Sequence, residues 1–294
     1  KMQYDIKLVL ENTYPDATGV ARNLIHVMPL HKPGQQALLS GSITVSPRPD
    51  ERRDSCDFFG NTVTEIAFRS PLAALSVTLS ARVERFAVPE PQDAQSCLLE
   101  HLGPELKVTQ TVAPHSPQHF LSASPRVATS PAMTAFAFDT TRPEMRTLEA
   151  VRAVGQRLHK EMRFDAGATD VDTPPETAFA NRHGVCQDFS HVMIACLRGR
   201  GIPAGYVSGF LRTSPPKGRP RLEGADAMHA WVRAWCGTGL GWVEYDPTND
   251  LFVAEDHIVV AYGRDYSEVA PLRGVLRTSG AQSSSHRVDV KPLA

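Results

Sequence analysis

The sequence predicts an α+β protein in which an antiparallel β domain is followed by helices and then by a second antiparallel sheet. Two observations favour this class. Apolar residues alternate with period two near the start of the chain, whereas from about residue 143 helical spacing comes first and strand-like stretches follow. We therefore expect a β-rich domain with a connecting segment over residues 1–140 and a second domain over residues 141–294.

Period-two alternation defines the first domain. It occurs at residues 4–10 and again at residues 75–79, and turn-rich segments such as residues 47–50 and Gly60-Asn61 lie between these stretches. Residues 1 to about 90 should thus form an antiparallel β domain. Residues 91–140 are rich in Pro, Ser, Gln and His, so we expect them to connect the two domains over the surface, with one short helix near residues 96–102.

The second domain combines helical segments with later strands. Apolar residues recur at helical spacing over residues 148–158, Pro174-Pro175 predicts the first turn of a short helix, and a longer helix is expected to begin at Cys186. Strand-like stretches follow at residues 206–211, 227–235 and 240–245. The Cys186 helix should pack on the antiparallel sheet that these strands form.

The composition and net charge limit the classes of partner and cofactor that we expect. The 294 residues include 31 basic and 32 acidic side chains, a net charge of −1, so bulk charge predicts neither a nucleic-acid nor a membrane partner. Scattered cysteines without a C-x-x-C pair, and acidic residues near Asp170 without calcium-loop spacing, predict no metal and no cofactor. Without a membrane-length apolar run or a signal peptide, we expect a reducing, cytoplasmic location. The five cysteines are Cys56, Cys97, Cys186, Cys196 and Cys236.

Cys186 stands where a helix is expected to begin. Unpaired backbone N–H groups in the first turn carry partial positive charge, which favours a thiolate over a thiol and could stabilise an oxyanion. Gly184 would let the chain turn sharply and let a substrate approach the backbone. Gln187 is a candidate oxyanion or groove residue, although first-turn polar side chains more often cap the helix.

The segment from Met228 to Pro247 predicts a β-hairpin. A two-residue Gly237-Thr238 loop would place His229 directly opposite Asp246, with their Cβ atoms about 4.5–5.5 Å apart. The carboxylate could then hydrogen-bond the imidazole and fix its tautomer. Trp231 is a candidate for the substrate groove, although aromatic residues in strands more often belong to the core.

Cysteine and histidine residues are more often structural than catalytic, and we assign no chemistry to the other four cysteines. His183 is a second candidate for the base, whereas His191 lies five residues along the helix from Cys186 and should point away from it. The helix start and the hairpin together favour Cys186 as nucleophile, His229 as base and Asp246 as the residue that orients the histidine.

Three ordered motifs resemble the bacterial transglutaminase-like family. They are GVCQDF at residues 184–189, HAWV at residues 229–232 and WVEYDPTN at residues 242–249. The resemblance also includes residues 256–266 and residues 57–61, and so spans most of the chain. It implies a papain-like core in which Cys186, His229 and Asp246 form a catalytic triad, preceded by the family's N-terminal β domain. Met228 stands where this family commonly has a smaller residue.

These observations predict acyl transfer through a thioester. The Cys186 thiolate would attack a carboxamide or peptide carbonyl, His229 would protonate the leaving amine, and water or a second amine would release the acyl group. Hydrolysis by a peptidase or amidase is the preferred outcome, with protein-glutamine cross-linking as the alternative. A non-catalytic module that binds peptides in the same cleft is a hypothesis of a different class. The expected partner is a peptide or protein substrate, and the sequence specifies no oligomeric state.

Overall fold

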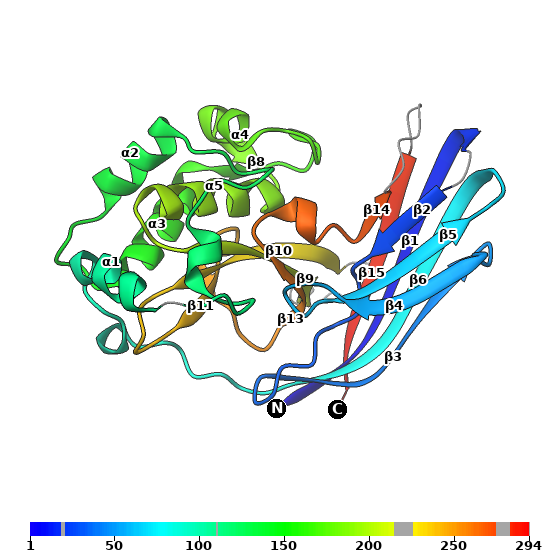
Figure 1. Ribbon diagram of the computed structural model, residues 1–294, viewed down its shortest axis with the longest axis horizontal. Helices are drawn as coiled ribbons and strands as arrows, with labels where there is room; N and C mark the ends of the chain where they lie inside the picture. Colours follow the sequence, from blue (N-terminus) through cyan, green and yellow to red (C-terminus); the bar gives the residue numbers. More distant parts are fainter. Residues whose placement is uncertain (19–20, 110, 215–225, 275–282, 294) are drawn as a thin grey trace.

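The computed structural model describes the 294-residue chain except residues 19–20, 110, 215–225, 275–282 and 294 (Figure 1). The described residues form a β unit, a central five-stranded sheet and a layer of helices. In Figure 1 the β unit is the blue, cyan and red part of the ribbon, and the green helices cover one side of the central sheet. None of the described helices combines the length and apolarity needed to cross a membrane.

Two four-stranded antiparallel sheets form the β unit, with strand orders β15-β1-β6-β3 and β14-β2-β5-β4. Alternate residues of β1 point inward, as period two predicts: Tyr4, Ile6 and Leu8 are buried, and Leu8 lies opposite Leu79 of β6. The two strands predicted in this region are therefore confirmed. The bounds are β1 Met2–Thr18, β2 Ala21–Ile25, β3 Gln36–Ser46, β4 Glu51–Cys56, β5 Thr62–Phe68, β6 Leu72–Arg85, β14 Leu272–Gly274 and β15 Ser283–Leu293.

The last strands of the chain return to this β unit. β14 pairs with β2, and β15 runs antiparallel along β1. Residues 141–294 are predicted to form the second domain, whereas these two strands complete the sheets of the first. Val288 and Val290 of β15 are fully buried, so this strand contributes to the apolar core. It also pairs with the edge of β1, which would otherwise be exposed. Both ends of the chain therefore build the β unit.

Five helices form one layer. α2, α3 and α4 pack against α5, and α1 packs against α3. The helices predicted near residues 148, 175 and 186 are present as α3 Thr147–Glu161, α4 Pro175–Asn181 and α5 Cys186–Gly199. The segment predicted to be a surface connection also contains α1 Leu99–Val108 and α2 Pro131–Thr140. The start of α2 carries a sequence signal that was not recognised. Ser130 is the N-cap residue, its hydroxyl accepts a hydrogen bond from the Met133 N–H, and Pro131 is the first helical residue.

The central sheet is antiparallel, with the order β12-β11-β10-β9-β13. α5 packs on β9 and β10, where Ala230, Val232 and Ala234 are buried in the main apolar core. The neighbouring residue Trp231 points to the other face, where it belongs to a separate apolar cluster. The bounds are β9 Ala204–Leu211, β10 Ala227–Trp235, β11 Trp242–Asp246, β12 Leu251–Phe252 and β13 His257–Gly263; β7 Arg163–Phe164 and β8 His183–Gly184 form a small parallel pair.

Candidate active site

α5 begins at Cys186, as its sequence context predicts. Val185 is the N-cap residue, with extended backbone. The Asp188 carboxylate folds back and accepts hydrogen bonds from the Val185 N–H at 2.8 Å and from the Thr169 hydroxyl at 2.6 Å. The helix start is thus held by its own first turn, and Cys186 lies half-buried at the positive end of the helix.

Gly184 has a different role from the one expected. We expected it to admit a substrate to the backbone, but the Asp188 side chain fills the space beside it. A Cβ at position 184 would lie 2.6 Å from both Cβ and Oδ2 of Asp188. Glycine is therefore required there so that the carboxylate can reach the Val185 N–H, and Gly184 serves the helix start rather than the substrate.

β10 and β11 form the predicted hairpin, but its loop is longer than expected. Trp235 pairs with Trp242, so the two-residue loop predicted at Gly237-Thr238 is wrong and the register differs by two residues. Because side chains alternate between the two faces of a sheet, a shift by two leaves each side chain on its original face. His229 and Asp246 therefore still share a face, as diagonal rather than directly opposed neighbours.

His229 contacts both other members of the predicted triad. Its Nε2 lies 2.7 Å from Asp246 Oδ2, and its ring lies beside the Cys186 side chain, close enough for the two groups to interact electrostatically. Burial acts to lower the pKa of His229, but the hydrogen bonds to Asp246 and Cys186 outweigh it and raise the pKa to about 10. The imidazole is therefore positively charged beside the thiol at neutral pH.

Asp246 is completely buried, and both of its oxygens accept hydrogen bonds. Oδ1 accepts from the backbone N–H groups of Thr248 at 3.0 Å and Asn249 at 3.2 Å. Oδ2 accepts from His229 at 2.7 Å, from His257 at 2.9 Å and from the Asn249 amide at 2.8 Å. Burial acts to raise the pKa of Asp246, but the hydrogen bonds from the two histidines hold it well below its usual range. The site therefore contains a fixed carboxylate charge.

His229, Asp246 and His257 also form the one grouping among the described residues whose ligand atoms lie close enough for a metal ion, within 4.8 Å of one another. Both imidazole Nε2 atoms face the same carboxylate oxygen, and a nitrogen that donates its proton there offers no lone pair to a metal. Hydrogen bonding thus accounts for the grouping, and the expected absence of a metal stays a prediction.

The two groove candidates occupy different places. Gln187 lines the cleft beside Cys186, and its amide donates to the Val171 carbonyl at 3.0 Å. Trp231 is fully buried on the sheet face away from α5, with its ring centre 6.0 Å from that of His229 and 5.0 Å from that of His257. Trp231 therefore supports the two imidazoles and does not line the groove.

The other histidines considered from the sequence have different partners. His191 Nε2 accepts a hydrogen bond from the Tyr266 N–H at 3.1 Å, and His183 Nδ1 lies 3.9 Å from the Asp165 carboxylate. The histidine that interacts with Cys186 is instead His229, the residue predicted to be the base.

Cys186 opens into a cleft of about 880 Å³ that lies between the core and the β unit. The core contributes Cys186, Gln187 and His229, together with Met228, so the residue that departs from the family pattern does border the cleft. The β unit contributes residues of β1, β2, β14 and β15, among them Asn23. Asn23 is only 4% exposed, and its Nδ2 has no hydrogen-bond partner.

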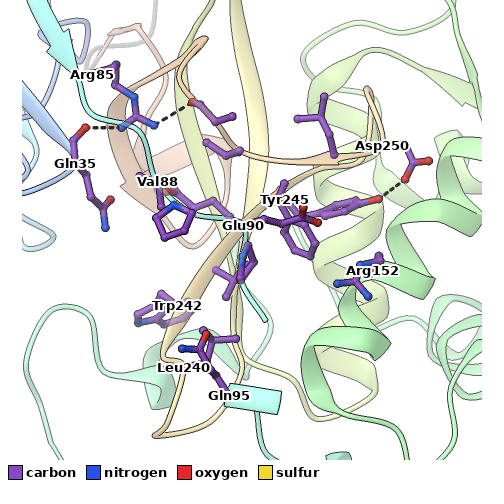
Figure 2. A pocket seen from close by; sticks show the side chains of 18 of the residues that line it. Gln35, Arg85, Val88, Glu90, Gln95, Arg152, Leu240, Trp242, Tyr245 and Asp250 are labelled. Carbon is purple, nitrogen blue, oxygen red and sulfur yellow. Dashed lines mark hydrogen bonds between the residues drawn. The ribbon is translucent and has the colours of Figure 1, made fainter. Parts of the chain in front are cut away.

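A second hollow, of about 570 Å³, lies beside β11 at the edge of the central sheet (Figure 2). Among its polar groups, Arg85 donates to the Ala254 carbonyl at 3.1 Å, and the Tyr245 hydroxyl donates to Asp250. Its described lining contains neither cysteine nor histidine. The Cys186 cleft is therefore the candidate active site.

Sequence reasoning missed three polar residues of this site. His257 and Asn249 were noticed only as parts of motifs, without a role, although a histidine and an amide near a candidate triad are a usable signal. Asn23 gave no signal, because its place in the cleft depends on how the β unit lies against the core.

Known proteins match both parts of the chain. Residues 134–247 match the family model of the Transglutaminase-like superfamily, and residues 4–84 match that of the Bacterial transglutaminase-like N-terminal region. An uncharacterised protein of Mycobacterium tuberculosis is 33% identical over 269 residues, which cover 88% of this chain and 83% of that protein. One of Mycobacterium leprae is 33% identical over 241 residues, covering 81% of each.

A solved structure has the same fold. It comes from Cytophaga hutchinsonii, is described as a candidate cysteine protease, and superposes with a TM-score of 0.76 at 20% identity, covering 100% of this chain and 91% of that chain. At this identity the likeness shows a shared fold. The predicted α+β class, with a cysteine-bearing helix on an antiparallel sheet after a β domain, is confirmed.

Proposed function

Because the chain belongs to the bacterial transglutaminase-like family and has its papain-like core and N-terminal β domain, we propose that Cys186, His229 and Asp246 form a catalytic triad for acyl transfer. One observation carries the proposal: His229 interacts with the Cys186 side chain and hydrogen-bonds a buried carboxylate. This is the nucleophile, base and orienting-group arrangement that cysteine acyl transfer requires.

The reaction begins with attack of the Cys186 thiolate on the carbonyl carbon of an amide. A C–S bond forms, and the oxyanion faces the free N–H groups of the first turn of α5. Gln187 can add to this, because its amide nitrogen has a second hydrogen besides the one given to Val171. The His229 imidazolium then gives its proton to the leaving amine as the C–N bond breaks, which leaves a thioester.

Water is the acceptor that the cleft favours. An amine acceptor such as lysine arrives as a cation, for which a carboxylate in the cleft would be the natural partner. The one carboxylate among the described lining residues is Asp172, and it already pairs with Arg126 at 2.8 Å. We therefore propose hydrolysis: water attacks the thioester, His229 takes up its proton, and the carboxylic acid leaves. Cross-linking to an amine is the second candidate, because the matching family model is named for transglutaminases.

Mass spectrometry of a glutamine-containing casein substrate, with and without a primary amine such as putrescine, separates these outcomes. Hydrolysis converts the glutamine carboxamide to a carboxylate or cleaves the peptide bond, and added amine leaves these products unchanged. Amine adducts in their place would assign cross-linking. No product from the wild-type protein, together with a Cys186 that reacts no faster than Cys56, would contradict the catalytic proposal and favour a binding module.

A further inference from the structure

Two imidazoles share one oxygen of Asp246. His229 reaches Oδ2 from β10 at 2.7 Å, and His257 reaches the same atom from the start of β13 at 2.9 Å. All three side chains are at least nine-tenths buried: His229 is 8% exposed, His257 3% and Asp246 0%. Bulk water therefore has little access to the shared oxygen.

The two histidines differ in what their second nitrogen contacts. The ring of His229 also interacts with Cys186, whereas Nδ1 of His257 is buried without a hydrogen-bond partner. A proton on that nitrogen would be a buried donor with nothing to bond, which is unfavourable. His257 therefore donates from Nε2 to Asp246, whereas His229 can exchange protons with the thiol.

This asymmetry separates their roles. Resting on the proposed function above, we propose that His257 is a positioning residue that holds the Asp246 carboxylate in the rotation that orients His229 toward Cys186. The backbone N–H groups of Thr248 and Asn249 hold Oδ1, and at Oδ2 the Asn249 amide and His257 both donate, so His257 shares this support with Asn249. The edge-on ring of Trp231, 5.0 Å from the His257 ring and at 83° to it, fixes the imidazole in turn.

The test uses the rate at which iodoacetamide alkylates Cys186 at pH 6, followed by peptide mass spectrometry because Cys56 is also exposed. This rate reports the thiol–imidazole array without any substrate. In His257→Leu, which cannot donate, we expect the rate to fall about 10-fold or more, as for other partners that orient a reactive group. In His257→Gln, whose amide can donate from nearly the same place, we expect a rate within about 3-fold of wild type.

A matched control separates positioning from general stability. His26 in the β unit is also buried, also has an Nδ1 without a partner, and lies 3.8 Å from Asp57. His26→Leu should leave the Cys186 rate unchanged even if it lowers the melting temperature.

Three results would overturn the inference about His257. One is a wild-type rate in His257→Leu. Another is an equal loss in the Leu and Gln variants. A third is a loss in His26→Leu that matches the loss in His257→Leu. A wild-type Cys186 no more reactive than Cys56 would instead contradict the proposed function, on which the inference rests.

Discussion

The two walls of the Cys186 cleft differ in how their polar groups are satisfied. On the core wall, both oxygens of Asp246 have partners, and His229 joins that carboxylate to the thiol. On the β-unit wall, Asn23 is almost completely buried with an amide nitrogen that bonds nothing. Buried polar groups normally have partners, so this one is expected to find its partner in the substrate. The comparison indicates that the core wall performs the chemistry and the β-unit wall contributes to binding.

The largest effect should come from the nucleophile on the core wall. Cys186→Ala removes the sulfur that forms the thioester, so we expect turnover of casein to fall below detection. The melting temperature should stay close to wild type, because Cys186 is only half-buried and the substitution keeps the Asp188 cap of the helix. Mass spectrometry of the products measures turnover, and a thermal melting curve measures the melting temperature. Retained turnover would exclude Cys186 as the nucleophile.

Asp246→Asn should have the next largest effect. The amide has nearly the same shape but loses the charge that holds the His229 imidazolium, so kcat should fall by about 10²–10⁴-fold with little change in KM. Steady-state kinetics give both constants. A rise in KM at constant kcat would instead show that Asp246 contributes to substrate binding and not to the chemistry.

The charge of His229 gives a pH prediction. Its raised pKa means that the stabilisation from its charged form is complete below pH 6.5, the ordinary value, and is lost as pH rises through about 10. The lowered pKa of Asp246 means that its contribution is complete above pH 3.8 and is lost as pH falls further. NMR titration of the His229 ring should therefore show a midpoint near pH 10, moving down in Asp246→Asn. A midpoint near 6.5 in the wild type would contradict the described array.

The smallest effect should come from the β-unit wall. Asn23→Leu keeps the approximate volume but removes the amide, and loss of one hydrogen bond to a substrate should raise KM about 5-fold at unchanged kcat. Asn181→Leu, a change at an exposed position that ends α4, is the control and should alter neither constant. An unchanged KM in Asn23→Leu would mean that this amide does not contact the substrate.

The sequence predicted the chemistry of the core wall better than its geometry. Cys186 at a helix start and a hairpin bearing His229 and Asp246 could be read from local patterns. The length of the loop could not be predicted in this way, because Gly237 and Gly241 both adopt positive φ and close a longer turn than the Gly237-Thr238 pattern suggests. The error did not separate the triad, since a shift of two residues preserves the face of the sheet.

Long-range packing set the limit of prediction elsewhere. Gly184 was expected to face a substrate, but the fold of the Asp188 side chain decides its role. Trp231 was a candidate for the groove, although aromatic residues in strands more often belong to the core, and it is buried in a cluster with Val207. Asn23 and the return of β15 to β1 depend on contacts between residues more than 200 positions apart, which local periodicity does not record.

The most direct test of the central claim is the alkylation rate of Cys186 in the wild type and in His229→Ala. At pH 6 an ordinary cysteine is almost entirely a thiol, so rapid labelling requires a neighbouring positive charge. The account predicts that Cys186 reacts much faster than Cys56 in the wild-type protein and that this advantage disappears in His229→Ala. Equal rates at Cys186 in the two proteins would show that His229 does not activate the thiol.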